Sequence, residues 1–413
     1  MTSLANKTKI LNDPIHGFTS IPNELLSHLV EHRYFQRLRR ISQLGLTYLV
    51  YPGAYHTRFH HALGAMHLMQ NAVKSLQSKG HPISEEEEQA VLIAILLHDI
   101  GHGPFSHALE HSIVDGVNHE DISILVMREL NEDFDGKLSL ALEIFQNKYH
   151  KIFLHQLISS QLDVDRLDYL KRDSFFSGVS EGIINSDRLI NMLNVSKGEL
   201  VIDAKAIYSV EKFIIARRLM YWQVYLHKTV LSAEFTLAEI LKRAKWLSKN
   251  GMTLFSTSAL KEFLDNNHSL ENFYTHKKLL EIFCKLDDND IMCSIKEWCS
   301  HPDKVLSLLS RMLIERKLLK IELQEKSFSE RYIENIKKRV VTKYGIKKED
   351  CHHMVFTNKI DNKAYNPKKD KINLLYKDGT IIDIAKAADQ LNISVLARTV
   401  TKYFLCYPKD CSI

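Results

Sequence analysis

Histidines are distributed very unevenly along this chain of 413 residues. The sequence contains 21 of them, and ten fall between His56 and His119. They concentrate in H-T-R-F-H-H at 56–61 and H-D-I-G-H-G-P-F-S-H at 98–107, followed by N-H-E at 118–120 and the acidic D-V-D-R-L-D-Y at 163–169. Imidazoles and carboxylates bind divalent metal ions, and imidazoles transfer protons near neutral pH. We therefore expect the chemistry of this protein to lie in these four segments.

His98 and Asp99 directly follow the apolar run V-L-I-A-I-L-L at 91–97. Ionisable groups at the end of a buried helix are costly unless they are paired or bound to a metal. An isolated His-Asp pair is more often a satisfied helix end than a pair of ligands. The three other segments shift the interpretation toward a metal site.

The same motifs, in the same order, resemble the HD-domain phosphohydrolase superfamily and, within it, the deoxynucleoside triphosphate triphosphohydrolases. The resemblance begins at N-D-P-I-H-G (12–17) and continues through F-Q-R-L-R-R-I-S-Q-L-G (35–45) and the four segments above. It ends near Y-L-H-K (225–228) and so covers roughly the first 230 residues. The resemblance implies an all-helical catalytic core.

The resemblance implies one divalent metal ion surrounded by His61, His98, Asp99 and Asp165. Two imidazoles and two carboxylates suit manganese, iron, magnesium or zinc. Members of the family usually carry Glu at the position of His60. Whether His60 or His61 coordinates the metal therefore stays open, with His61 favoured.

Proton transfer is implied for His107, which has Glu110 three residues further on. At this helical spacing a carboxylate can hold an imidazole in one tautomer and raise its basicity. The resemblance places His107 close to the attacked phosphorus and the leaving oxygen, and His102 and His119 against phosphate oxygens. A hydrogen-bonded structural histidine is the alternative for each, above all for His119.

Fixed cations are needed for a triphosphate, because guanidinium groups bind phosphate oxygens in pairs. The resemblance implies phosphate contacts for Arg58, Arg166 and Arg217. Arg58 and Arg166 stand beside ligand candidates. Arg217 lies next to Arg218, and a solvated basic helix face is the alternative there.

The resemblance places sugar and base contacts on five residues: Gln43, Leu44, Tyr169, Asp173 and Tyr225. Asp173 and Gln43 would hydrogen-bond the 3'-hydroxyl. Tyr225 with Leu44 would crowd the 2' carbon and leave no room for a ribose hydroxyl. The alternative for Tyr225 is an ordinary core aromatic residue.

Helices are expected to position these residues. Ser84 and Glu87 have the spacing of a capping box before the apolar run, which predicts a buried helix over 84–97. Apolar residues at helical spacing predict a second helix over 60–77. Further helices are predicted at 24–44, 119–130, 138–146, 151–170, 186–194 and 204–248. The first 250 residues should therefore be almost wholly α-helical.

The last hundred residues are richer in β-strand signals. R-K-L-L-K-I-E-L-Q and C-H-H-M-V-F-T-N-K-I suggest strands around a helix near 328–344, and Asp378-Gly379 between apolar runs predicts a hairpin. The predicted fold class is mainly α. It has an HD-domain core at 1–250, a helical extension at 251–310 and a small α+β C-terminal appendage at 311–413.

The composition is that of a globular protein, with 45% hydrophobic and 25% charged residues. No stretch reaches the roughly 18 apolar residues that span a bilayer, and the N-terminus lacks the apolar core of a signal peptide, so a cytoplasmic protein is expected. The six cysteines form no C-x-x-C pair and should be reduced thiols. A net charge of +5 permits a polyanionic ligand without indicating nucleic acid.

The expected reaction is hydrolysis of deoxynucleoside triphosphates at the α-phosphorus, giving deoxynucleoside and inorganic triphosphate. The absence of a P-loop motif agrees with a reaction that does not remove the γ-phosphate. The alternatives are another HD-type phosphohydrolase, either a monophosphatase or a phosphodiesterase, and a regulator that binds nucleotide or nucleic acid. The basic segment 364–377 motivates the regulator.

The resemblance also implies a homo-oligomer, a dimer or a tetramer, since members of the family generally assemble. Some of them bind a regulatory nucleotide at an interface lined by the segment that matches Asn12, Asp13, Gln36 and Arg39. The alternative is that N-D-P-I-H-G is simply a tight turn before the first helix.

Overall fold

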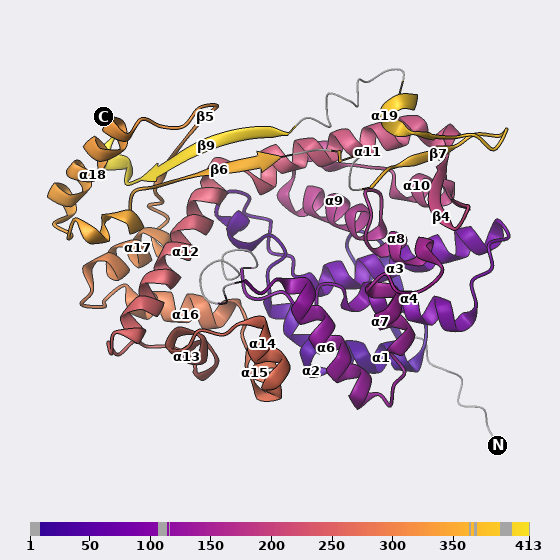
Figure 1. The fold of residues 1–413 in the computed structure, drawn as a ribbon, viewed down its shortest axis with the longest axis horizontal. Coiled ribbons are helices and arrows are strands. Elements are labelled where there is room, and N and C mark those ends of the chain that lie inside the picture. Colours follow the sequence, from indigo (N-terminus) through magenta and orange to yellow (C-terminus); the bar gives the residue numbers. More distant parts are fainter. Residues whose placement is uncertain are drawn as a thin grey trace.

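The computed structural model describes residues 9–105, 114, 116–362, 365–366, 370–388 and 399–412. The fold is mainly α, as predicted, and Figure 1 shows helices along its whole length with small sheets at the C-terminal end of the chain. At the centre, α3 (Arg58–Ser78) packs against α4 (Glu85–Leu97) and α9 (Val164–Ser177). These three helices carry the predicted metal ligands.

Helix α4 begins and ends where the sequence predicts. The Ser84 backbone N–H donates to Glu87 Oε2 at 2.8 Å, and the Glu87 N–H donates to Ser84 Oγ at 3.2 Å, which completes the capping box. All residues from Ala90 to Leu97 are buried. The helix therefore has no solvent-facing side along this stretch, and it delivers His98 to the interior.

The other helices of the first 250 residues differ in length from the predicted ones, because most are shorter and the helix predicted over 119–130 extends to Asp133. They are α1 (Glu24–Glu31), α2 (Arg33–Gln36), α6 (His119–Asp133), α7 (Ser139–Phe145), α8 (Ile152–Ile158), α10 (Ser186–Met192), α11 (Ile207–Met220) and α12 (Lys228–Lys249). Short 3-10 turns cover Arg37–Arg40, Gly45–Leu49, Ser180–Gly182 and Ala204–Ala206, and a π-helical turn covers Tyr221–Tyr225.

Three long predicted helices are interrupted, and side-chain caps explain two of the interruptions. His32 is extended and caps α2, which divides the helix predicted over 24–44. Asp163 accepts hydrogen bonds from the backbone of Ser160 and Arg166, so it starts α9 and divides the helix predicted over 151–170. The helix predicted over 204–248 is interrupted by the π-helical turn, which ends at Tyr225.

The prediction that the first 250 residues are almost wholly helical was wrong in two places. β1 (Lys9–Asp13) pairs antiparallel with β2 (Gly17–Ile21), and β3 (Leu193–Ser196) pairs antiparallel with β4 (Glu199–Asp203). N-D-P-I-H-G is therefore the turn of a hairpin, with Gly17 at a φ of 74°. These strands have four or five residues each, too short for a clear alternating pattern.

The remaining helices follow the expected order. Residues 251–319 contain α13 (Ser258–Asp265), α14 (Leu270–Thr275), α15 (Lys277–Phe283), α16 (Asp288–Trp298) and α17 (Lys304–Ile314). Further along the chain are α18 (Glu330–Tyr344), α19 (Ile384–Ala387) and 3-10 turns at Glu349–His353 and Lys409–Cys411. α18 is the helix predicted near 328–344.

The C-terminal strands form two sheets. β5 (Lys320–Gln324) and β6 (Phe356–Asn362) both pair antiparallel with β9 (Val400–Tyr407), in the order β5-β9-β6. β7 (Asn373–Leu375) and β8 (Ile381–Asp383) form the predicted hairpin, with Gly379 at a φ of 84°.

The second of these sheets joins the middle of the chain to its C-terminal segment. β7 pairs in parallel with β4, with Leu374 opposite Ile202, and the sheet order is β3-β4-β7-β8. Figure 1 shows β7 beside β4 and α19 over α11. One hydrophobic core extends from Ile21 to Cys411. The predicted boundaries at 250 and 310 therefore mark changes in secondary structure and not gaps in the packing.

No helix within the described part of the chain has both the length and the apolar character needed to cross a membrane.

Candidate metal centre and active site

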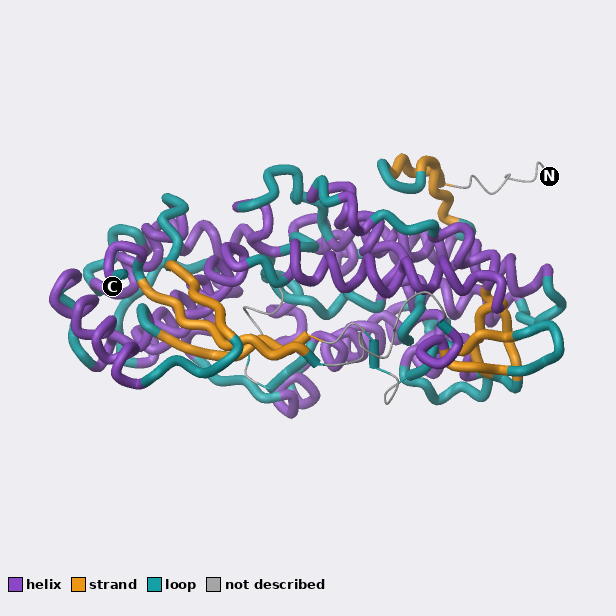
Figure 2. The backbone as a smooth tube through the Cα atoms, turned by 90° about the horizontal axis from the view of Figure 1, so that it is seen from above, coloured by secondary structure: helices purple, strands orange, loops and turns teal. Residues whose placement is uncertain are grey.

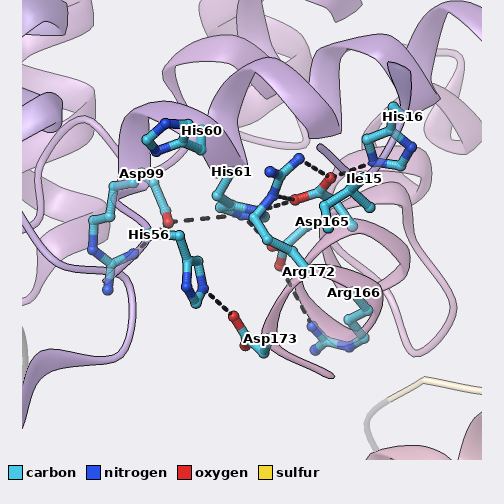
Figure 3. A network of polar contacts seen from close by, with 12 residues as sticks. Ile15, His16, His56, His60, His61, Asp99, Asp165, Arg166, Arg172 and Asp173 are labelled. Atoms are coloured by element: carbon cyan, nitrogen blue, oxygen red, sulfur yellow. Dashed lines mark hydrogen bonds and ion pairs between the residues drawn. The ribbon is translucent and has the colours of Figure 1, made fainter. Parts of the chain in front are cut away.

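The structure brings the four predicted metal ligands together from three helices. Nε2 of His61, in the first turn of α3, lies 3.3 Å from Nε2 of His98, at the end of α4. Asp165 Oδ1, in the first turn of α9, is 3.0 Å from His61 Nε2 and 3.5 Å from His98 Nε2. Asp99 Oδ1 is 3.4 Å from His98 Nε2. Figure 3 shows this convergence around His61.

The Nδ1 atoms of His61 and His98 are each held by a hydrogen bond outside the cluster. His98 Nδ1 lies 2.6 Å from the carbonyl oxygen of Ile95, and His61 Nδ1 lies 2.7 Å from Asp168 Oδ2. A carbonyl or an ionised carboxylate only accepts hydrogen bonds, so both Nδ1 atoms carry the proton and both Nε2 lone pairs face the cluster. His61, His98 and Asp99 lie close enough together to hold a divalent cation, and Asp165 lies beside both histidines.

The electrostatics of the cluster also favour a cation. Burial disfavours a charged His61, but hydrogen bonds and charge from Asp165 and Asp168 outweigh it and raise its pKa to about 10. A buried site with this excess of carboxylates requires positive charge, which either a proton or a metal ion supplies.

His60 lies outside the cluster. Its Nδ1 is 3.2 Å from the backbone nitrogen of Thr57 and 2.9 Å from Thr57 Oγ1, so the ring caps the first turn of α3. Of the two adjacent histidines, the structure brings only His61 into contact with His98 and Asp165.

A buried ionic chain behind His61 was missed by the sequence analysis. Asp168 accepts from His61 Nδ1 and His16 Nε2, each at 2.7 Å, and from Arg172 Nε at 2.8 Å. Arg172 Nη1 lies 2.9 Å from Asp13 Oδ2. Although burial raises the pKa of Asp168, Arg172 and the other donors outweigh it and hold the pKa well below its ordinary value. The signal was present, because these residues lie in or next to the N-D-P-I-H-G and D-V-D-R-L-D-Y motifs.

Two of the predicted phosphate-binding arginines lie beside carboxylates of the cluster. Arg58 forms an ion pair with Asp99. Arg166 Nη1 lies 3.7 Å from Asp165 Oδ2 and 3.5 Å from Asp163 Oδ2. The third, Arg217, donates from Nη1 to Gln161 Oε1 at 3.2 Å.

Two of the four predicted catalytic residues can be placed. His102 Nε2 is 3.3 Å from Asp99 Oδ1, and its ring stacks on His119 at a centroid distance of 3.8 Å. Burial and the charge of Arg58 lower the pKa of His102 to about 3, so its imidazole is neutral at pH 7. The other two, His107 and Glu110, lie outside the described residues.

The predicted sugar-binding residues form a wall around Asp173 and His56. Asp173 Oδ1 is 2.6 Å from His56 Nε2, and the Tyr225 hydroxyl donates to Asp173 Oδ2 at 2.8 Å. Gln43 joins this group through its backbone N–H, which donates to the His56 carbonyl at 3.0 Å. Leu44 follows and packs against the core. His56 was missed, although it begins the H-T-R-F-H-H motif.

Tyr169 links the wall to the metal ligands. Its ring centroid is 6.4 Å from that of His61 and 6.1 Å from that of Tyr225. Tyr225 ends the π-helical turn, a distortion that is frequent at functional sites.

The N-terminus of α16 holds two loops of the site, although the sequence analysis assigned no role to residues 251–310. Asp288 Oδ2 accepts from the Ser42 backbone N–H at 2.8 Å, next to Gln43. Asp288 Oδ1 accepts from the Phe105 N–H at 3.1 Å, where Phe105 has a φ of 50°. This carboxylate therefore secures a backbone position that non-glycine residues rarely adopt.

Arg37 ties the same elements together from inside the core. Its guanidinium donates to the carbonyls of Leu286 at 2.8 Å, Ile100 at 3.2 Å and His102 at 2.6 Å. The fully buried side chain therefore connects the loop after α4 to the start of α16.

Comparisons with known proteins agree with this arrangement. The HD domain family matches residues 58–173, and the HD associated region matches residues 184–254. A crystal structure of a phosphohydrolase from Bacteroides thetaiotaomicron superposes with a TM-score of 0.94 at 51% identity and covers 97% of this chain and 100% of that chain. A hypothetical protein from Aquifex aeolicus superposes with a TM-score of 0.73 at 27% identity and covers 98% and 97%.

Sequence relatives extend the comparison. An uncharacterized protein of Bacillus subtilis is 33% identical over 98% of this chain and 93% of its own length. The deoxynucleoside triphosphate triphosphohydrolase SAMHD1 homolog of Dictyostelium discoideum is 32% identical over 65% of this chain and 55% of its own length.

The helical fold and the histidine and aspartate cluster between α3, α4 and α9 define a phosphohydrolase with the residues for a metal centre. The chain belongs to the HD-domain phosphohydrolase superfamily, as its motifs predicted.

Proposed function

We propose that this protein hydrolyses deoxynucleoside triphosphates at the α-phosphorus and releases deoxynucleoside and inorganic triphosphate. The observation that carries the proposal is the position of Tyr169, whose ring lies 6.4 Å from that of His61 in the candidate metal centre and 6.1 Å from that of Tyr225, which donates to Asp173. Arg166 stands between the ligand Asp165 and Asp163. A nucleotide substrate needs such neighbouring sites, one for its sugar, one for the reacting phosphorus, and cations for its outer phosphates. The triphosphohydrolases among the relatives support the same substrate class.

We further propose that His61, His98, Asp99 and Asp165 hold one divalent ion, with manganese, iron, magnesium and zinc all compatible with the donor set. When bound, such an ion polarises a phosphoryl oxygen and acidifies water.

The chain's own residues then bind charge and move protons. Arg58, Arg166 and Arg217 would neutralise the triphosphate. His102, whose Nε2 faces Asp99, and His119, which stacks on it, would line the phosphate site, and this assignment rests on the family resemblance. His107, supported by Glu110, would transfer the proton to the leaving 5'-oxygen, and this assignment rests on the family resemblance.

The sugar would be recognised by the wall. Asp173, fixed by His56 and Tyr225, would accept from the 3'-hydroxyl, and Gln43 would contact the same group. Tyr225 and Leu44 would crowd the 2' carbon. A ribonucleotide would then have to displace packed side chains to fit its extra oxygen.

A homo-oligomer, either a dimer or a tetramer, and a regulatory nucleotide are part of the proposal. Ile10 and Phe18 on the N-terminal hairpin are 61% and 77% exposed, and such apolar side chains favour burial in an interface. Near the hairpin in sequence, Arg39 Nε donates to Gln36 Oε1 at 2.9 Å, so the two residues predicted to contact an effector lie side by side.

The identity of the released phosphate tests the reaction. Purified protein is incubated with single dNTPs and with pairs of them, in Mn²⁺, Mg²⁺, Fe²⁺ or Zn²⁺, and the products are separated by ion chromatography. We expect inorganic triphosphate and deoxynucleoside in equal amounts. Release of orthophosphate from nucleoside monophosphates, or cleavage of phosphodiesters without triphosphate release, would replace the proposal with one of its rivals.

A further inference from the structure

The hairpin β1–β2 is attached to the body of the protein through its turn and through β2, which contacts α1 and α3. Within the described residues its strands pair only with each other, and Lys9, Ile10 and Phe18 on them are exposed. Figure 2 shows the hairpin at the edge of the molecule, next to the N-terminus. An isolated two-stranded hairpin is marginally stable in water. Its position therefore depends on contacts with the body, which are those of its turn, the buried Ile21 and the ion pair of Lys9 with Glu31. The Gln70 side chain also donates to the Ser20 carbonyl at 3.0 Å.

The turn itself is fixed by Asp13. Asp13 Oδ1 accepts from the backbone N–H groups of Ile15 at 2.8 Å and His16 at 2.9 Å. Asp13 Oδ2 pairs with Arg172 Nη1. These bonds set the direction in which the His16 side chain leaves the turn, toward the interior, where only 3% of the side chain is exposed.

His16 then contacts the carboxylate that anchors the metal ligand. His16 Nε2 is 2.7 Å from Asp168 Oδ1, and His61 Nδ1 is 2.7 Å from Asp168 Oδ2. The contact crosses 152 residues of sequence and joins the hairpin to α9 and α3 (Figure 3).

The geometry of a carboxylate is set by all of its donors. Arg172 donates to both oxygens of Asp168, at 2.8 and 3.0 Å, and each histidine lies against one of them. All three side chains therefore oppose rotation of the carboxylate. Without the His16 donor, Oδ1 of Asp168 would keep only its hydrogen bond from Arg172, in a fully buried site. Rotation of the carboxylate would turn the His61 ring, and with it Nε2, away from His98 and Asp165.

We infer that His16 is a positioning residue of the candidate metal centre, which acts through Asp168 to hold His61 in the orientation that binds the ion. The N-terminal hairpin is then a structural part of the metal site, although no ligand lies on it. This inference rests on the proposed metal site but not on the proposed substrate. Because coupling between two events is reciprocal, ion binding must also stabilise the docked hairpin.

The first test measures Mn²⁺ affinity by titration of metal-free full-length protein, with binding followed by electron paramagnetic resonance. His16→Leu removes the donor, whereas His16→Gln keeps an amide donor at a similar reach. His67→Leu is the matched control, because the His67 ring lies 5.3 Å from that of His16 but belongs to α3 and does not bond to Asp168. We expect His16→Leu to bind Mn²⁺ about 10- to 100-fold more weakly, which is the typical effect of removing a residue that orients a metal ligand. Binding should be within threefold of wild type for His16→Gln and His67→Leu.

Wild-type affinity in His16→Leu would overturn the inference, as would equal losses in His16→Leu and His67→Leu. If His16→Leu does not fold, His16→Gln decides, since affinity more than tenfold below wild type in a folded protein would also overturn the role of the donor.

The second test uses only wild-type protein. Amide hydrogen exchange of residues 9–21 should slow by about tenfold or more at saturating Mn²⁺, while exchange of α18, far along the chain, stays unchanged. If the exchange rates of residues 9–21 are the same with and without Mn²⁺, the coupling between ion binding and hairpin docking is contradicted. Neither test uses a nucleotide, so loss of the proposed dNTP hydrolysis would leave both outcomes readable.

Discussion

At the scale of single residues, the chemistry depends on which ring nitrogen faces the centre. His61 and His98 both use Nδ1 for an anchor, one a carboxylate and the other a carbonyl, and both direct Nε2 at the cluster. Asp99 has a second role, because it pairs with Arg58 as well as lying beside the histidines. The two histidines are therefore oriented by Asp168 and the Ile95 carbonyl, which are not themselves ligand candidates.

The first prediction concerns Asp99. Asp99→Ala should abolish both metal retention and hydrolysis, because it removes a ligand and leaves the Arg58 charge without its carboxylate. The fold should persist, since α4 is packed by its apolar residues. Metal analysis and circular dichroism of the purified variant measure both effects. Wild-type metal content in Asp99→Ala would remove this residue from the coordination sphere.

The second prediction concerns selectivity for the sugar. Wild-type protein should hydrolyse dGTP and leave GTP nearly untouched, and Tyr225→Ala should bring the two kcat/KM values closer together by removing the ring. Tyr225→Phe is the control, because it keeps the ring and loses only the hydrogen bond to Asp173. The Tyr225→Phe variant should keep the wild-type preference for dGTP over GTP. Equal cleavage of GTP and dGTP by the wild type would refute the sugar-wall assignment and leave the metal site intact.

At the scale of elements, the site is a junction of helix ends held by distant segments. α3 must approach α9 closely, and Gly64 permits it, because a Cβ there would lie 2.1 Å from Asp168 Oδ1 and 2.2 Å from Arg172 Nη2. α16 contributes its N-terminus, where Asp288 secures two loops. Helices that provide no ligand therefore determine the positions of those that do.

The third prediction is that Gly64→Ala destabilises the protein, although the same change in an exposed helix stabilises by about 1 kcal/mol. Overpacking against a buried ion pair should instead cost about 1–3 kcal/mol. Urea denaturation measures the free energy of unfolding, and a lower value for Gly64→Ala than for wild type would confirm the prediction. A Gly64→Ala variant more stable than wild type would mean that α3 and α9 are further apart than described.

The fourth prediction concerns Asp288. Asp288→Asn should lower kcat about tenfold or more while Mn²⁺ affinity stays within threefold, because an amide has only one acceptor for two backbone donors and the loops at Ser42 and Phe105 would shift. Asp287→Asn is the control, since Asp287 caps α16 and pairs with Arg40 but holds neither loop. Equal effects of the two substitutions on kcat would indicate a role in helix capping alone.

At the scale of the whole molecule, the C-terminal third is bound into the fold. β7 completes a sheet with β4, and α19 packs on α11. Leu374, Tyr407 and Cys411 belong to the same core as the helices around the site. The segment 311–413 thus contributes to the stability of the region that carries Arg217 and Tyr225.

The fifth prediction is that a chain ending at residue 310 is unstable. Loss of residues 311–413 exposes the edge of β4 and part of the shared core. The truncated protein should therefore be insoluble or unfold at a clearly lower temperature. Soluble yield and thermal unfolding measure this, with the full chain as control. A truncated protein with the full chain's Tm would establish 311–413 as an independent unit.

The sequence alone determined the class of fold and predicted the segments in which the chemistry lies. The capping box at Ser84 and the uninterrupted apolar run predicted α4 to the residue, because caps and hydrophobic periodicity act within one or two helical turns. The histidine and aspartate motifs predicted four ligand candidates, which the structure brings together, but the roles of these residues stay predictions.

Only the tertiary structure decided what supports those ligands. The bond of His16 to Asp168 spans 152 residues, and that of Arg37 to the Leu286 carbonyl spans 249. The same holds for the parallel pairing of β4 with β7 and for the position of Asp288 between two loops. Local patterns report the preferences of neighbouring residues, whereas these contacts depend on which buried polar groups meet when distant segments pack.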